Sequence, residues 1–580
     1  MNNKGIAIRY GDVAPEAKEN FVPTASESKF NTLSQLQQYN LNFPNYANPC
    51  ELYSVVLDGT ATAFPSVPEQ SNLGLWSEQI SNDDGTFTEP IVLELESAGQ
   101  YSSQGLTLTF DTYNGIYATR LSIKWLRITN EGITTLDEKE YNPDNAFYFC
   151  RNFVENYNKI VITFYSLNMP KNRLKLRVID YGYGTFFYGN ELRGVKLIQE
   201  IDPISTQISI NTADFTLDSR SDMEYSFQQK QPLSVYFNGQ LKATTFVKKS
   251  TRKAKRLWSI QSEDYIGLMD SIPYYGGIYT NKNAIELLTN IFTVAKVPYS
   301  IDEVFADAVI TGYIPFTTCR DALMQVAFAM QAVVDTSNSE VVKVFALEED
   351  VKQTVPLNRI MQGQNFADDE TVTGVEVAVH SYKPITETVN VYDANESGTG
   401  QNIFVKFSEP LHDLSIINGE IVSRGTNYAV INANSGCILR GQQYEHTTQT
   451  RRKNNPVVLA SEIEKIVSVE NATLVSQYNI DKVIEKCYDW LIKTNTTNLK
   501  IVEGKHIQYG EPYKYGTGLK YGTGLKYGGK YQNVITYDKP VNVGENIQAE
   551  TEYLGVVSGR LIKQSFNLNG NIIIKEAVLK

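Results

Sequence analysis

Residues 258–302, WSIQSEDYIGLMDSIPYYGGIYTNKNAIELLTNIFTVAKVPYSID, pass from a strand pattern to a helix pattern. The first third alternates in the manner of a half-buried strand. Apolar side chains at helical spacing, from Ile285 to Phe292, then predict a helix over residues 282–296. Asn281 is the expected N-cap. The stretch therefore places an α/β segment directly after a β-rich one.

Two further helices are predicted downstream. One begins after Thr317 or Thr318 and carries a stripe of small and branched apolar residues. It is followed by a strand pair with a polar turn. The other covers residues 479–493, with Asn479 as the expected N-cap. We expect all three helical stripes to face a core.

Most of the remaining chain reads as strands. Residues 26–183 hold short alternating runs separated by turn signals, which favours a β-sandwich. Asn238 and Gly239 give the strongest hairpin signal of the chain. Residues 1–25 lack periodicity and are predicted to form an N-terminal arm. The glycines of residues 182–194 predict a linker that changes direction sharply.

The charge pattern argues against stable binding of nucleic acid. The formal net charge is −12, whereas a sequence-blind DNA binder needs many phosphate-neutralising cations. The one dense basic run, KKSTRKAKR at residues 248–256, lies between strand-like segments. It is interpreted as a solvated hairpin tip, or else as a contact with an acidic partner surface.

The residues offer little for metal or cofactor chemistry. The five cysteines are scattered without a CxxC pair, so neither a zinc site nor a disulfide framework is expected. Cys319 and Cys487 fall in helical patterns and should be buried. The four histidines are far apart in the sequence, and phosphate-loop and hydrolase motifs are absent. We predict no cofactor, no metal and no enzymatic activity.

Two further features concern location and a repeat. The beginning of the sequence lacks an apolar segment of signal-peptide length, and no stretch approaches a membrane span. Synthesis in the cytoplasm is therefore expected. Residues 514–531, KYGTGLKYGTGLKYGGKY, are too short and too glycine-rich for a packed repeat. They are interpreted as a loop, with contact to glycans or another subunit as the alternative.

The end of the first strand-rich block resembles galactose-binding-like jelly rolls. The resemblance is carried by NKIVITFYSL and NRLKLRVIDYG, with LTLTFD and WLRIT upstream. In such a domain four aromatic residues could stack on a sugar ring, although an aromatic on an alternating strand is more often part of the core: Trp76, Tyr113, Tyr117 and Trp125.

About half of the chain resembles hub proteins of tailed-phage baseplates, tail tips and contractile injection systems. The order of the motifs carries this resemblance: W.I...D.IGLMD, then the two helices, then IDKVIEKCYDWLIKT and TEYLGVVSGRLIKQSFNLNGNIIIKEAVL. The resemblance implies a homotrimer in which each chain supplies two β-barrels. Such a ring adapts a hexameric tail tube to a threefold tip and encloses the channel for the tape-measure protein and DNA.

The combined expectation is a mainly β, multidomain fold in a virion. It comprises an N-terminal arm (1–25), a galactose-binding-like β-sandwich (26–183), a first hub β-barrel (195–275), an α/β module (276–350), a β-rich module (351–460) and a helix, Gly/Tyr-rich loop and second hub barrel (461–580). The implied partners are tail-tube and distal tail proteins, the tape-measure protein, a tip or spike protein and passing DNA. A carbohydrate-binding adhesin, with a cell-surface glycan as partner, is the alternative function, and a cell-wall hydrolase is the third.

Overall fold

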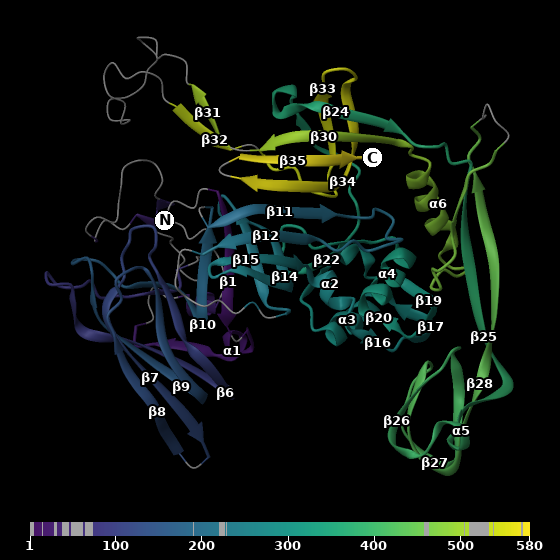
Figure 1. Ribbon diagram of the computed structural model, residues 1–580, viewed down its shortest axis with the longest axis horizontal. Helices are drawn as coiled ribbons and strands as arrows, with labels where there is room; N and C mark the ends of the chain where they lie inside the picture. The colour runs from purple at the N-terminus through teal and green to yellow at the C-terminus, as the bar shows by residue number, and fades with distance from the viewer. Residues whose placement is uncertain are drawn as a thin grey trace.

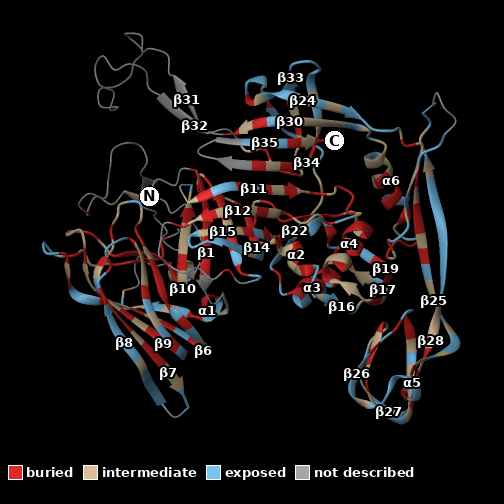
Figure 2. Ribbon diagram, in the orientation of Figure 1, coloured by how far each residue is buried: buried red, intermediate tan, exposed pale blue. Residues whose placement is uncertain are grey.

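A computed structural model describes most of the chain (Figure 1). The described residues are 5–13, 15–27, 32–37, 46–47, 51, 62–63, 73–130, 132–189, 191–219, 227, 229–457, 463–503, 505–509, 533–537, 539–569 and 572–580. The fold is mainly β, as the sequence predicts, and divides into parts that each have their own buried apolar cluster (Figure 2).

The N-terminal part is a curved sheet of long strands. Its main strands are β2 (Val22–Ala25), β5 (Leu75–Trp76), β6 (Thr86–Phe110), β7 (Ala118–Thr129), β8 (Gly132–Tyr141), β9 (Phe147–Leu167) and β10 (Lys175–Tyr188). Alternate side chains of β6, β7 and β9 face one core, which contains Trp125, Tyr157 and Phe164. Strands this long bend, so one sheet can enclose its own apolar face.

The first residues form a strand, which corrects the expectation of an arm without periodicity. β1 (Ile6–Val13) pairs with β10 on one side and with β13 (Pro232–Phe237) on the other. Ile6, Ile8 and Tyr10 alternate into the core. Because both partners lie more than 160 residues away, a single short run gave no local hairpin signal.

Residues 182–194 are also more regular than a linker. β10 continues through Tyr188, pairing with β6 in the N-terminal sheet over Leu176–Tyr181 and with β1 over Gly182–Tyr188. One strand therefore belongs to two sheets. Gly182 has φ 130°, a conformation that favours glycine, at the point where the partner changes.

The first sheet contains β1, the end of β10 and five strands that are consecutive in the sequence. These five are β11 (Leu192–Glu200), β12 (Thr212–Asp218), β13 (Pro232–Phe237), β14 (Gln240–Ala254) and β15 (Leu257–Glu263). The predicted hairpin is confirmed: Asn238 and Gly239 connect β13 to β14 with φ values of 49° and 79°. The basic run lies at the far end of the β14–β15 hairpin, where its side chains are exposed.

The α/β module follows the first sheet. Its elements are α2 (Tyr265–Met269), β16 (Pro273–Tyr274), β17 (Gly277–Asn283), α3 (Ala284–Ala295), β18 (Tyr299–Ile301), β19 (Val309–Ile314), β20 (Thr317–Thr318), α4 (Cys319–Met330), β21 (Val333–Asp335) and β22 (Val342–Phe345). The apolar stripes of α3 and α4 share one core, as predicted. The N-cap of α3 is Asn283 instead of Asn281, and its Oδ1 accepts from the Glu286 N–H at 3.2 Å. Thr318 caps α4, as expected.

A long two-stranded arm extends from the module and carries a small head (Figure 1). The arm consists of β25 (Gly374–Asp393) and β28 (Tyr428–Asn454), and the head adds α5 (Ala394–Ser397), β26 (Gly400–Lys406) and β27 (Leu411–Arg424). At the base of the arm, β29 (Ile466–Val469) and α6 (Ile480–Leu491) pack against β25. The predicted third helix is thus confirmed.

The second sheet gathers strands from both sides of the arm. It contains β23 (Val351–Val355), β24 (Ile360–Asp368), β30 (Asn495–Glu503), β33 (Asn546–Thr551), β34 (Gly555–Asn569) and β35 (Ile572–Leu579). β23 and β24, which the sequence grouped with the β-rich module, pair with β33 and β30 instead. The Gly/Tyr-rich tract at 514–531 lies outside the described residues.

Asp264 ties the first sheet to the α/β module. Its carboxylate caps α2 by accepting from the Ile266 and Gly267 N–H groups at 3.1 and 3.2 Å. It also accepts from the Asn211 N–H at 3.0 Å and from the Thr336 hydroxyl at 2.6 Å. The residue is fully buried, and burial raises the pKa of its carboxyl to about 6.

This burial predicts a pH-dependent stability. As the pH rises from about 4 to 6, the unfolded chain releases the Asp264 proton while the folded chain retains it, so the free energy of unfolding falls. An Asp264→Asn variant cannot titrate there. The free energy of unfolding of the wild type minus that of the variant should fall by about 2–3 kcal/mol between pH 3.5 and 7. Denaturant titrations at several pH values check this, and parallel pH profiles would contradict it.

Candidate functional site

The most distinctive site is the joint between the two sheets. β11 of the first sheet pairs with β34 of the second in an antiparallel register from Val195 opposite Leu568 to Glu200 opposite Lys563. β34 also pairs with β33 and β35. The hydrogen-bond ladder therefore runs continuously from one sheet into the other, and β34 is the strand that they share (Figure 1).

Two buried amides fix the register of this joint. Gln199 and Gln564 are directly opposite each other and are 0% and 1% exposed. Gln564 Nε2 donates to Gln199 Oε1 at 2.6 Å, and Gln199 Nε2 donates to the Lys242 carbonyl at 2.6 Å. Gln564 Oε1 is buried without a partner in this register. A slip of one residue would also break both hydrogen bonds and leave further buried amide groups unpaired, which is costly.

The second sheet also completes the core of the first. Phe566 of β34 is 1% exposed and belongs to the apolar cluster of the first sheet. The Lys575 ammonium lies 4.8 Å from the centre of its ring, which adds a cation–π contact. The two sheets therefore form one packed unit, although each has its own core.

A buried ion pair connects β30 to β35 in the second sheet. Lys575 Nζ lies 2.5 Å from Glu503 Oε1 and donates to the Val541 carbonyl at 2.7 Å. Glu503 Oε1 also accepts from the Val541 N–H at 2.8 Å, and Arg359 Nη2 is 3.8 Å away. Each charge has several partners, as buried charges require.

Several strands in the described part of the chain have a ladder partner on one side only, among them β23, β24 and the Gly182–Tyr188 half of β10. β24 has a ladder partner, β30, on one side, and most of its side chains are exposed. The Gly182–Tyr188 half of β10 likewise has β1 alone as its ladder partner. Exposed edge strands carry unpaired N–H and C=O groups and are ready to pair with another chain.

The four candidate sugar-stacking residues do not form one platform. Trp76 and Trp125 are 1% and 0% exposed, as expected of core aromatics, so sugar stacking on either ring is excluded. Tyr113 is half exposed and Tyr117 is partly buried. Sugar binding at these two tyrosines stays a prediction.

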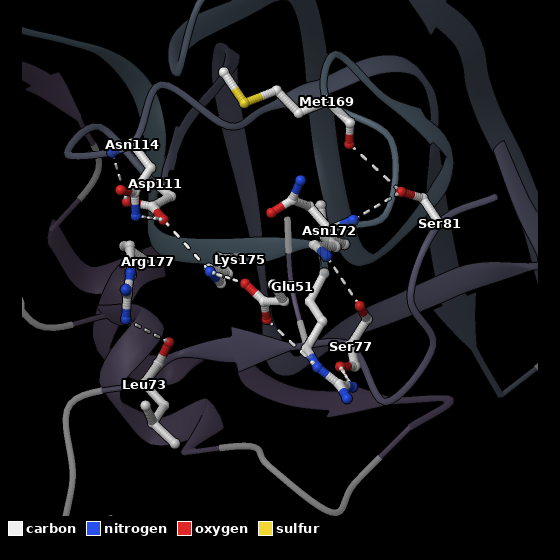
Figure 3. A network of polar contacts seen from close by, with 12 residues as sticks. Glu51, Leu73, Ser77, Ser81, Asp111, Asn114, Met169, Asn172, Lys175 and Arg177 are labelled. Carbon is white, nitrogen blue, oxygen red and sulfur yellow. Dashed lines mark hydrogen bonds and ion pairs between the residues drawn. The ribbon is translucent and has the colours of Figure 1, made fainter. Parts of the chain in front are cut away.

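A polar network that includes Glu51, Lys175 and Arg177 lies in the N-terminal part (Figure 3). Two of its cations lie against the Trp76 ring. The Lys175 ammonium lies 4.6 Å from the centre of the Trp76 ring and 2.5 Å from Glu51 Oε2. Asp111 Oδ2 is 3.7 Å from the same ammonium. The Arg177 guanidinium lies 5.2 Å from the ring. The indole therefore packs against two buried cations, an arrangement that no local sequence pattern indicates.

Two histidines meet although they are distant in the sequence. His380 Nδ1 lies 3.0 Å from His446 Nε2, and the two rings are stacked. The Tyr382 ring also stacks on the His446 ring, with the ring centres 4.5 Å apart. The β25–β28 register brings them together, so pairing the two arm strands was the missing signal. Burial lowers the pKa of His380, which favours its neutral form.

Among the described residues, no group of three or more His, Cys, Asp or Glu side chains could hold a metal ion. No helix in the described ranges is long and apolar enough to cross a membrane. Cys319 and Cys487 are buried, as predicted, and burial raises the pKa of Cys319 to about 11 and that of Cys487 to about 12.

Comparison with known proteins gives weak structural matches. No family model and no curated protein matches the sequence. Similar solved structures include a tail protein from Neisseria meningitidis (10% identity, TM-score 0.38, 67% of this chain and 91% of that chain), a 43 kDa prophage tail protein from Shewanella oneidensis (8%, 0.38, 67% and 97%) and a prophage tail protein from Listeria monocytogenes (11%, 0.36, 68% and 91%). At identities and TM-scores this low, the matches carry no argument about function, which has to be inferred from the residues of this chain.

The joint yields a test of its packing. Phe566→Ala should lower the free energy of unfolding by about 3–5 kcal/mol, because it empties a buried site in the first core. Hydrogen exchange should also become faster at the amides of both β11 and β34. Phe153→Ala, at a side chain that is 58% exposed, is the matched control and should cost far less. Exchange that changes in the second sheet alone would contradict the joint.

Proposed function

We propose that this chain is a structural, non-enzymatic hub of a phage or phage-like tail tip or baseplate, and that three copies close into a ring. The observation that carries the proposal is the joint itself: one chain holds two sheets that are fused edge to edge through β11 and β34. Three such chains would place six sheets around a threefold axis. The six sheets would match a sixfold tail tube, and the threefold axis would match a threefold tip.

The open edges support ring closure. A heterologous interface, in which one edge of a copy meets a different surface of the next, closes when the rotation returns to its start. β24 at the end of the second sheet and the Gly182–Tyr188 half of β10 are such edges. Pairing or covering them would satisfy their backbone groups and protect them from aggregation.

The partners follow from the ring. Its wide face would meet tail-tube and distal tail proteins and its narrow face a tip or spike protein, while the tape-measure protein and DNA pass through. A net charge of −12 suits a wall that must let DNA slide without holding it. The polar interactions described above join one part of the chain to another and build no catalytic arrangement.

The oligomeric state tests this function. Native mass spectrometry should give a trimer of about 196 kDa, three times 65.3 kDa. Particle images should show a ring with six similar lobes. A monomer alone at high concentration, with tail partners present, would contradict the hub.

A surface substitution tests the edge. Met361→Glu, at a side chain of β24 that is 40% exposed, should shift the trimer towards the monomer because it places a charge in the contact. Ile133→Glu on β8, where the side chain is 66% exposed, is the matched control and should leave the trimer intact. Equal effects of the two variants would remove β24 from the interface.

A further inference from the structure

A cavity lies where the first sheet, the α/β module and the second sheet meet. Its volume is about 490 Å³, within the range of sites for small organic ligands. Gln240–Lys242 at the start of β14 form one wall and the β21–β22 hairpin forms another. Residues 540–546, before and at the start of β33, form the third. None of the roles assigned above uses this cavity.

Lys242 is the unusual residue of its lining. The side chain is 5% exposed. Its backbone carbonyl is engaged by Gln199 Nε2 at 2.6 Å and by the Asn338 N–H at 3.1 Å. In the part of the chain that the structure describes, its ammonium has no hydrogen bond and no ion pair. An ammonium in a side chain buried this deeply keeps little of its water, so an anionic partner would stabilise it.

The acidic groups of the lining are already engaged. Asp335 accepts from the Ser337 N–H at 2.9 Å, and Glu348 forms an ion pair with Lys352. Glu545 accepts from both the backbone and the side-chain N–H groups of Asn542, at 3.2 and 2.8 Å.

The carboxylate that attracts Lys242 most is also shared. Glu503 raises the pKa of Lys242, but burial outweighs it and lowers that pKa overall. Glu503 itself is held by Lys575 at 2.5 Å and by the Val541 N–H at 2.8 Å. Glu503 is therefore shared with Lys575 and the Val541 N–H and does not form an ion pair with Lys242.

A second cation lines the same cavity. Lys343 of β22 is half-buried and donates to the Ser337 carbonyl at 3.2 Å. An ammonium has three N–H groups, and two of them make no hydrogen bond in the described part of the chain. The Asp335 carboxylate attracts the same ammonium, so an anion at this site would compete with Asp335 for Lys343. We propose that this cavity binds a small organic anion with a carboxylate or phosphate group, which the ammonium groups of Lys242 and Lys343 hold.

Such a ligand would bridge two of the three walls, β14 through Lys242 and β22 through Lys343. Binding to the folded chain alone raises its stability by mass action. The site does not depend on the proposed tail function, because it rests on residues within one chain. A monomeric protein could still bind the anion, and a trimer could lack it, so the two proposals fail separately.

Thermal unfolding of the full chain tests the site. Sodium citrate and sodium phosphate serve as separate probes, each compared with sodium chloride at equal ionic strength. At least one should raise the Tm by about 2 °C or more at saturation, and the stronger probe tells carboxylate from phosphate. Lys242→Met should abolish the shift, whereas Lys255→Met, at an exposed lysine of the β14–β15 hairpin, should keep it. No shift with either probe, or an equal shift in Lys242→Met, would overturn the proposal.

A measurement on the wild type covers the case in which Lys242→Met does not fold. Limited acetylation with acetic anhydride, followed by peptide mass spectrometry, gives a rate for each lysine. The probe that raises the Tm should slow acetylation of Lys242 several-fold and leave Lys255 unchanged. Equal rates at Lys242 with and without the probe would also refute the site.

Discussion

The antiparallel pairing of β11 with β34 is the interaction on which the rest of the structure depends. It links strands whose paired glutamines, Gln199 and Gln564, are 365 residues apart in the sequence. Closing so long a loop adds little extra entropy cost over a shorter one, because that cost grows with the logarithm of length. Pairing between strands so far apart in the sequence is expected to slow folding, because the ladder forms only after β34 reaches β11. The core of the first sheet stays incomplete until Phe566 arrives from near the end of the chain.

Buried charges mark the other places where distant segments meet. Asp180 of β10 forms ion pairs with Arg9 at 2.8 Å and with Lys18 at 2.9 Å. These ion pairs hold the first residues of the chain against β10, the strand that belongs to two sheets. Asp264 likewise joins the first sheet to the α/β module, and Glu503 joins β30 to β35 in the second sheet. A buried ion pair adds little net stability compared with apolar packing. The buried ion pair instead favours the native arrangement, because any other arrangement leaves a buried charge without a partner.

The sequence predicted what is local and missed what is not. The three long helices were foreseen because the apolar stripe of each lies within one short window. The Asn238–Gly239 turn was foreseen because its left-handed backbone suits those residue types. β1 was missed, as were the true partners of β23 and β24, because strand pairing depends on residues far away. The glutamine pair of the joint was equally hidden. A lone polar residue in a strand reads as solvent-facing until the opposite strand is known.

The joint and the cavity are physically one system. Gln199 holds Gln564 with its carbonyl oxygen and the Lys242 carbonyl with its amide nitrogen, so the group that fixes the strand register also positions the backbone of the buried lysine. Any anion bound at Lys242 acts on a residue already hydrogen-bonded to the joint. Linkage is reciprocal: a ligand that prefers the closed joint strengthens it, and closure of the joint improves the site for the ligand to the same degree. The stability of the pairing between the two sheets is therefore open to control from a cavity that neither sheet forms alone.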